Sequence, residues 1–347
     1  MCEIIEIRVL KLGNADSIIV VLKKNDEILI ILLDTGRASH LKIILSELKA
    51  VLTTYGKAGP DLVICTHYDF DHIGSLQAIV GRYKIHVKEV WMHKTSKLIE
   101  IAERLEGSDD VSSLILPDEE AMELGIEGNG IIDYEDEDVQ DILQQLKHEV
   151  ETLAALKEMG IDPKEPIHGL CSFEGWPEIE VVGPTFEYYK SLFPDHFDFN
   201  RFIELEKLEL KASKEDSDDE VSGKDVFERL DEFDRTGLTP TNLNSAIIQI
   251  TTAEGKFLFA GDAGIESFQQ IPDYQNKIKS VHFFKVPHHG SANNLNSELI
   301  QLISPQVAFI SGGSHVSNKV VAALKHQGAD VYVTKDIEGT LMYPLKI

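Results

Sequence analysis

Four side chains able to bind a metal ion lie within six consecutive positions of one loop. These side chains are His67, Asp69, Asp71 and His72. They follow an apolar segment at 62–65 that predicts a buried strand. On a tightly turned loop, His67 and Asp69 can project to one side while the next two ligands turn toward a neighbouring point. The spacing therefore indicates a site for two adjacent metal ions rather than a chance group of polar loop residues.

A carboxylate follows another predicted strand, at 256–260. The chain continues as Gly261-Asp262, and an Asp delivered by the end of a buried strand suits an anion that bridges two cations. Taken alone the signal is weak, because an Asp after Gly more often caps a turn or the helix that follows. We expect Asp262 to bind metal because it accompanies the loop at 66–74.

Histidines end two further predicted strands. The strand at 283–286 leads to His288 and His289, and adjacent histidines can divide metal binding and proton handling between them. We favour His288 as the ligand. The strand at 307–310 leads to His315, which by itself is more typical of a surface residue. Since every candidate follows the carboxyl end of a predicted strand, we expect one edge of the sheets to collect them all.

The elements that must position these residues are two groups of strands with helices between and around them. Strands are predicted at 4–10, 17–22, 28–33, 62–65, 88–92, 178–182, 245–251, 256–260, 283–286, 307–310 and 331–333. Helices are predicted at 40–55, 137–160, 296–303 and 317–327. A length of 347 residues suits a single large unit built from two packed sheets, so we predict one domain over 1–347.

Negative charge is concentrated in the middle of the chain. The net charge is -26, and residues 101–236 hold 39 Asp and Glu against 12 Lys and Arg. We predict acidic insertions at about 105–136 and 185–241, which either keep the protein soluble, act as a lid or recruit a basic protein partner. Such a charge repels a nucleic-acid backbone and argues against indiscriminate DNA binding.

The motif order resembles the metallo-β-lactamase superfamily, and within it the soluble hydrolase domain of ComEC/Rec2 competence proteins. The motifs that carry this resemblance are the turn at 13–17, Asp34-Thr35-Gly36, the loop at 66–74, Asn242-Leu243-Asn244-Ser245, Gly261-Asp262, the loop at 288–291 and the stretch 331–340. The resemblance covers roughly 3–92, 165–184 and 242–347. It implies an α+β fold, a four-layer αββα sandwich with metals between the sheet edges.

One position follows the pattern of that branch, and one loop departs from it. Asp69 matches the branch but stands where most other superfamily members have His, which makes the ligand set harder, so zinc is favoured and manganese is credible. The loop that usually ends in His-Pro is shorter here and runs His315-Val316. The predicted site thus comprises metal ligands and catalytic side chains. The metal ligands are His67, Asp69, Asp71, His72, Asp262, His288 and His315, and the catalytic side chains are Asp71, His289 and His315.

We predict a dinuclear metal-dependent hydrolase, most simply a phosphodiesterase or nuclease acting on a nucleotide or nucleic acid. Hydrolysis of a carbonyl substrate such as a lactone or thioester stays open, since the same metal pair supports it. A non-catalytic interaction protein that uses the acidic insertion is the hypothesis from another class. The acidic start of the chain and three sparse cysteines favour a cytoplasmic protein, and no apolar run is long enough to enter a membrane.

Overall fold

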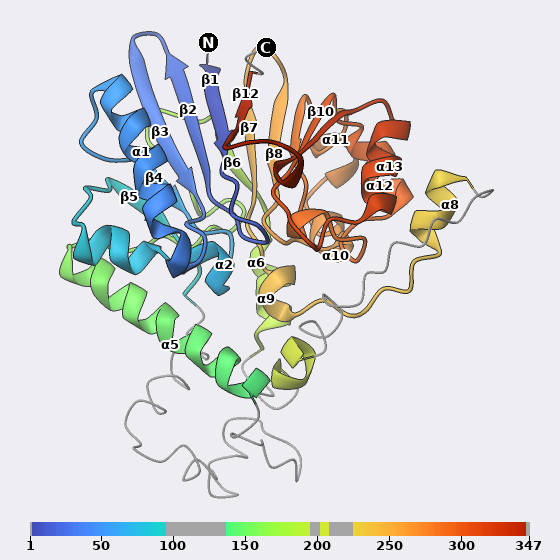
Figure 1. Ribbon diagram of the computed structural model, residues 1–347, viewed down its shortest axis with the longest axis horizontal. Helices are drawn as coiled ribbons and strands as arrows, with labels where there is room; N and C mark the ends of the chain where they lie inside the picture. The colour runs from blue at the N-terminus through green and yellow to red at the C-terminus, as the bar shows by residue number, and fades with distance from the viewer. Residues whose placement is uncertain (1, 95–136, 195–201, 208–224, 345–347) are drawn as a thin grey trace, which may run out of the picture.

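Two mixed β-sheets of six strands each lie face to face in the computed structural model, and helices cover the outer face of each sheet (Figure 1). The structure describes residues 2–94, 137–194, 202–207 and 225–344. Helix, sheet, sheet and helix layers follow one another, so the predicted αββα sandwich is confirmed.

The first sheet has the order β12-β1-β2-β3-β4-β5. Its strands are β1 (Cys2–Val9), β2 (Ile18–Lys24), β3 (Glu27–Leu33), β4 (Leu62–Ile64), β5 (Glu89–Trp91) and β12 (Leu341–Tyr343). Antiparallel pairs join β12, β1, β2 and β3, whereas β3, β4 and β5 run parallel. The two parallel pairs bring the ends of β3 and β4 to the same edge, and the loop at 66–74 follows there.

The second sheet has the order β11-β10-β9-β8-β7-β6. Its strands are β6 (Ile179–Gly183), β7 (Ile247–Thr251), β8 (Lys256–Phe259), β9 (Phe283–Lys285), β10 (Val307–Ile310) and β11 (Asp330–Val333). The last four strands, β8 to β11, are parallel, so the loops that carry Asp262, His288 and His315 leave the sheet at one edge. This parallel order explains why the candidate residues lie at one edge of the sheet, as the sequence predicts.

The core between the sheets is built by the alternation of side chains along each strand. In β2, Ile18, Val20 and Leu22 face the second sheet, and the residues between them face the helices. Phe283 and Phe309 contribute to the same inner layer with ring centroids 4.9 Å apart. Full burial of one such side chain is worth about 1.5–3 kcal/mol, so this layer holds the two sheets together.

Helices on the outer faces present apolar residues at helical spacing. In α1 (Leu41–Tyr55), the buried side chains Ile44, Leu48 and Val51 lie on one face, and the helix ends at Gly56, whose φ is 65°. The other helices are α2 (Phe70–Ile73), α5 (Glu137–Glu158), α6 (Phe186–Leu192), α8 (Val226–Asp231), α9 (Pro240–Leu243), α10 (Ile265–Gln269), α11 (Tyr274–Lys277), α12 (Ser297–Ile303) and α13 (Asn318–His326). Shorter helical turns occupy Ala38–His40, Ala78–Arg82, His288–Gly290 and Thr334–Asp336.

Two details differ from the sequence prediction. The strand expected from residue 245 begins at Ile247, because Asn244 ends α9 and the Ser245 hydroxyl bonds elsewhere in the fold. The last strand is β12, which pairs with β1 and lies beyond the predicted strand at 331–333.

The two insertions stay predictions. The one at 105–136 lies outside the described residues. Of the one at 185–241, the described parts contain α6, the helical segment 202–207, α8 and α9. No helix in the described ranges is long and apolar enough to cross a lipid bilayer.

Candidate metal centre

The loop after β4 divides its four polar side chains between an extended segment and a helix. His67 precedes the turn, Asp69 has extended φ and ψ angles of -65° and 148° at the start of α2, and Asp71 and His72 lie within that helix. The backbone of His72 is fixed from two sides, because its carbonyl accepts from the Thr35 amide and its own amide donates to the Asp69 carbonyl. The switch from extended chain to helix aims the side chains of one short loop in different directions.

One carboxylate oxygen of Asp262 lies near three histidines from two different loops. Its Oδ2 atom is 3.3 Å from Nε2 of His72, 3.9 Å from Nε2 of His67 and 3.9 Å from Nε2 of His288. Nε2 of His67 is also 3.5 Å from Oδ2 of Asp69. Asp262 therefore lies between the loop after β4 and the loop after β9, where the sequence predicts a bridging carboxylate.

A second group of ligand atoms lies beside the first. Nε2 of His289 is 3.5 Å from Oδ2 of Asp71. His289, Asp71 and His72 form one set whose ligand atoms are all within 4.8 Å of one another, and His67, His72 and Asp262 form another. Since His72 belongs to both sets, the two groups adjoin.

The buried histidine nitrogens of these clusters are suited to binding a metal ion. The Nε2 atoms of His67, His72 and His289 are buried and have no hydrogen-bond partner among the described residues. Nearly all buried polar side-chain atoms in folded proteins have a partner, so three such atoms directed at carboxylates point to a missing ligand. Imidazole nitrogens with carboxylate oxygens are the donors that zinc and manganese accept.

The other nitrogens of His67 and His72 are held by buried hydrogen bonds. Nδ1 of His72 is 2.9 Å from Oδ2 of Asp34, which also accepts from the Thr66 hydroxyl at 2.8 Å. Nδ1 of His67 is 3.2 Å from the Ser245 hydroxyl. Such partners fix the tautomer and the orientation of a metal-binding imidazole and leave Nε2 directed at the ion.

The adjacent histidines of the loop after β9 have different partners. Nδ1 of His288 is 2.8 Å from Oδ1 of Asn294, whereas Nδ1 of His289 is 3.0 Å from the Ser311 carbonyl and 3.5 Å from Oδ1 of Asp16. His289 is the more buried of the two and belongs to a ligand cluster with Asp71. The preference for His288 as the ligand stays a prediction, and the geometry makes His289 an equal candidate.

Behind His289, a buried ion pair supports the centre. Lys285 of β9 donates from Nζ to Oδ2 of Asp16 at 2.7 Å, and both side chains are only 1% exposed. Asp16 also accepts from the Ser311 hydroxyl. Asp16 thus joins the turn before β2 to β9 and to the segment after β10.

Charges in the centre shift the pKa values of its members in a consistent direction. Burial lowers the pKa of His72, but the carboxylates of Asp262 and Asp34 outweigh it and raise this pKa well above its usual value. Burial also opposes protonation of His289, yet the bond to Asp16 and the charge of Asp262 raise its pKa to about 9. The carboxylates therefore favour a positive charge among the histidines, and a divalent cation supplies it without a proton.

His315 stands apart from the clusters. Its ring centroid is 6.4 Å from that of His288 and 6.2 Å from that of His289. Burial and the nearby histidines lower its pKa to about 4, so the side chain is neutral at pH 7. Oδ1 of Asn14 accepts a hydrogen bond from the Gly313 amide at 2.8 Å and so holds this loop in place. The metal-binding and catalytic roles of His315 remain predictions.

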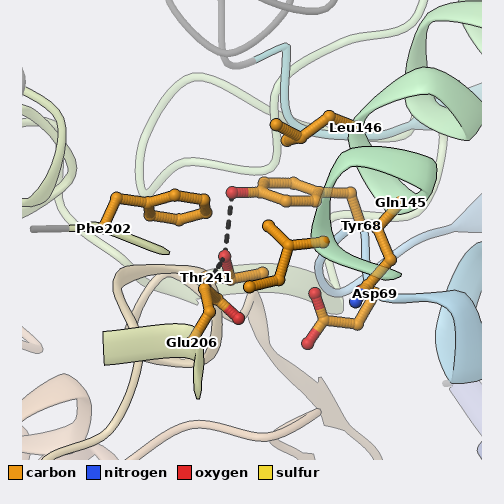
Figure 2. Close-up of a pocket in the computed structure, with 8 residues that line it drawn as sticks. Tyr68, Asp69, Gln145, Leu146, Phe202, Glu206 and Thr241 are labelled. Carbon is orange, nitrogen blue, oxygen red and sulfur yellow. Dashed lines mark hydrogen bonds between the residues drawn. The ribbon is translucent and has the colours of Figure 1, made fainter. Parts of the chain in front are cut away.

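Tyr68 connects the metal loop to a described part of the predicted insertion. Its hydroxyl is 2.8 Å from that of Thr241, which donates to Oε1 of Glu206 at 2.9 Å. Figure 2 shows these side chains around a pocket that Asp69 also lines, with Phe202 of the segment 202–207 on its far side. The described segment 202–207 therefore packs beside the loop that carries Asp69, and the lid stays a prediction.

Sequence reasoning missed the side chains that orient the histidines. They are Asp16, Asp34, Ser245, Lys285 and Asn294. Asp16, Asp34 and Ser245 belong to motifs that carry the family resemblance, so their type and position gave a signal. Lys285 and Asn294 gave none, since a Lys inside a strand and an Asn in a loop are ordinary surface residues in sequence.

Replacing Asp34 by asparagine is expected to weaken metal binding by about 10- to 100-fold, as loss of an outer carboxylate partner does in other metal sites. Asparagine keeps the shape but withdraws the negative charge that holds Nδ1 of His72. Competition with a chromophoric chelator measures the affinity. Asp61→Asn is the control, because Asp61 also accepts from a backbone amide, that of Ile30, and contacts no histidine of the centre. Equal affinity of both variants would contradict the role of Asp34.

Comparison with known proteins places the chain in a family. The family model of the metallo-β-lactamase superfamily matches residues 12–156 and 174–315. Over 110 residues the chain is 31% identical to ComE operon protein 3 of Bacillus subtilis (strain 168), a region that covers 30% of this chain and 14% of that protein. The chain thus spans a small part of this relative's length.

A solved structure, a mutant of the CmlA beta-hydroxylase, is similar with a TM-score of 0.39 and 12% sequence identity over 97% of this chain and 54% of that one. This likeness is too distant to bear on function. The match of the family model to most of the chain, with its ligand motifs gathered at one edge of the sheets, shows that the protein belongs to the metallo-β-lactamase superfamily.

Proposed function

We propose that this protein is a dinuclear metal-dependent hydrolase that cleaves phosphodiesters. The observation that carries the proposal is the convergence of three buried, unpartnered imidazole nitrogens on the carboxylates of Asp71 and Asp262. A polar cluster built only for stability would satisfy these nitrogens with hydrogen bonds. Zinc is the favoured ion, and manganese is the second choice because several ligands are carboxylates.

Six side chains would hold the two ions. They are His67, Asp69, Asp71, His72, Asp262 and one of the pair His288 and His289. Asp262 would be shared, since one of its oxygens approaches histidines on both sides. Divalent ions in such a site supply a water that is deprotonated near neutral pH and stabilise developing negative charge on the substrate.

The protein's own residues orient the site and handle protons. Asp34, Ser245 and Asn294 hold three imidazoles by their Nδ1 atoms, which prevents the rings from turning. His315 is neutral at pH 7 and only partly buried, so it can accept a proton at the rim of the centre and release it to solvent. The packed segment 202–207 would restrict water on the side of Tyr68.

A phosphodiester is preferred over a carbonyl substrate because the motif order, with the loops at 66–74 and 288–291, resembles the hydrolase domain of ComEC/Rec2 competence proteins, a resemblance that suggests phosphodiester cleavage. The acidic middle of the chain disfavours the binding of a long polynucleotide, so a short or single phosphodiester suits the surface better.

Three free, buried cysteines support a reducing, cytoplasmic location.

A substrate panel on zinc-loaded and manganese-loaded protein tests the proposal. The panel contains bis(p-nitrophenyl) phosphate, a dinucleotide, linear DNA, a lactone and a thioester. We expect turnover of the first two, abolished by a chelator and restored by added metal. Turnover of only the lactone or thioester would move the assignment to carbonyl chemistry, and no turnover at all by metal-loaded protein would remove the hydrolase proposal.

A further inference from the structure

Arg37 lies at the edge of the centre with its side chain open to solvent. It follows Asp34-Thr35-Gly36 after β3, and its Nη2 atom is 3.2 Å from Oδ2 of Asp71. The guanidinium side chain is 49% exposed, whereas that of Asp71 is 19% exposed. Arg37 therefore stands between a predicted metal ligand and bulk water.

The backbone beneath this arginine is fixed. The Ser75 hydroxyl donates to the Arg37 carbonyl at 2.8 Å, and the Arg37 amide donates to Nδ1 of His40 at 3.3 Å. Gly36 adopts a left-handed φ of 55° that turns the chain toward the centre, and its amide donates to the Asp16 carbonyl. These hydrogen bonds hold the backbone at Arg37, so its guanidinium group is kept within reach of one place where a ligand can bind.

The contact with Asp71 uses little of the guanidinium. An arginine has five N–H donors in a planar fork, and the structure gives this side chain one ion pair through one nitrogen among the described residues. Exposed single contacts of this kind are worth about 0–1 kcal/mol, so the pair is easily exchanged for a better anion. The remaining donors are available to a ligand.

The charge of Arg37 is unusual for its surroundings. The chain carries a net charge of -26, and the centre itself contains three aspartates among its predicted ligands. The other cation that contacts a carboxylate of this region within the described residues, Lys285, is buried against Asp16. Among the described residues that contact carboxylates of this region, Arg37 is thus the cationic side chain exposed to solvent.

We propose that Arg37 anchors the substrate by binding a negatively charged, non-bridging oxygen of the phosphodiester. The inference rests on the proposed function and deepens it, because a cation at this position selects an anionic ester over a neutral lactone or thioester. A planar fork binds two phosphate oxygens at once, which a lysine cannot do. Arg37 would set specificity and orientation while the side chains described above hold the metals.

Binding of inorganic phosphate to the metal-loaded full chain gives a readout that does not depend on turnover. Calorimetry is compared for the parent, Arg37→Ala, Arg37→Lys and the control Arg82→Ala. Arg82 is an exposed arginine that stacks on Tyr83 and contacts none of the centre. We expect Arg37→Ala to weaken phosphate binding by about 10- to 100-fold, the range for loss of a hydrogen bond to a charged group, and Arg37→Lys to retain part of it. Arg82→Ala should match the parent.

Two further measurements make the result decisive. Metal content must be the same in all four proteins, since loss of metal in Arg37→Ala would assign Arg37 to holding Asp71 and overturn the proposal. The ratio of kcat/KM for bis(p-nitrophenyl) phosphate to that for neutral p-nitrophenyl acetate should fall in Arg37→Ala. An unchanged phosphate Kd together with an unchanged ratio would overturn it as well.

The failure of the anchor is distinguishable from failure of the proposed function. If the parent cleaves phosphodiesters and Arg37→Ala does so with the same KM, Arg37 alone is wrongly assigned. If the parent cleaves only the neutral ester but phosphate binding still depends on Arg37, the anion site stands and the phosphodiesterase proposal fails.

Discussion

Replacing Asp262 by alanine is expected to reduce bound metal from about two ions per chain to one or none. Turnover should fall by more than about 100-fold, because loss of a residue that only supports a metal ligand costs up to about 100-fold. The reason is that a single oxygen, Oδ2, lies 3.3 to 3.9 Å from the Nε2 atoms of three histidines. Alanine removes the carboxylate that would be shared between the two ions. Elemental analysis after dialysis against metal-free buffer measures the loss.

Thermal unfolding gives a second, independent readout of the same substitution. A ligand that binds only the folded state stabilises it by about 2.7 kcal/mol at a concentration 100 times its Kd. Added zinc should therefore raise the Tm of the parent and raise that of Asp262→Ala much less. Asp162→Ala is the control, because Asp162 is a carboxylate that is 95% exposed and pairs only with Lys94 in the described structure. It should retain the metal content and the zinc response of the parent.

Two outcomes would contradict this account of the centre. Full metal content and full activity in Asp262→Ala would show that Asp262 is not a ligand. A parent protein that binds no divalent metal after reconstitution would remove the metal hydrolase altogether and leave the interaction protein as the working hypothesis.

The layers and the convergence of the strand ends were predictable because both depend on local patterns. Continuous apolar runs define β2 and β3, and parallel strands deliver their following loops to one edge. The four loops that carry Asp69, Asp262, His288 and His315 could therefore be assigned to one edge before any contact between them was known. Strand limits were less certain, as the start of β7 shows.

The division of labour between His288 and His289 could not be predicted because it depends on an unusual backbone. Both residues have positive φ values, 46° and 54°, which residues other than glycine rarely adopt. This double turn directs one ring toward Asn294 and the other toward Ser311. The sequence contains no glycine at either position to signal the turn. Strained backbone of this kind clusters at functional sites.

The supporting contacts were hidden by distance along the chain. Asp16 and Lys285 are 269 positions apart, and no feature of the sequence pairs one with the other. Only the packing of the two sheets against each other brings the turn before β2 close to β9.

Replacing Lys285 by methionine is expected to reduce the free energy of unfolding by about 3–5 kcal/mol, the usual result of removing one partner of a buried ion pair. Methionine fills most of the volume of the lysine stem, so the loss comes from the Asp16 carboxylate, which is left buried without its cation. Urea unfolding of the metal-free protein measures the difference. The control is Lys277→Met, which breaks an ion pair of the same 2.7 Å length to Glu180 that is 31% and 37% exposed.

The two ion pairs have the same length and differ mainly in exposure, so their comparison reports the effect of burial, although Lys285 also donates from Nζ to the Val286 carbonyl at 3.0 Å. Lys277→Met should cost no more than about 1 kcal/mol, because solvent screens the charges and the freed glutamate is hydrated. Adding Asp16→Asn to Lys285→Met should recover a large part of the loss, since the amide removes the uncompensated charge. The recovery will be incomplete, because Asp16 also accepts from the Ser311 hydroxyl and adjoins His289. If Lys285→Met is no more destabilising than Lys277→Met, the buried pair does not stabilise the fold, and its role beside His289 is limited to orienting that ring.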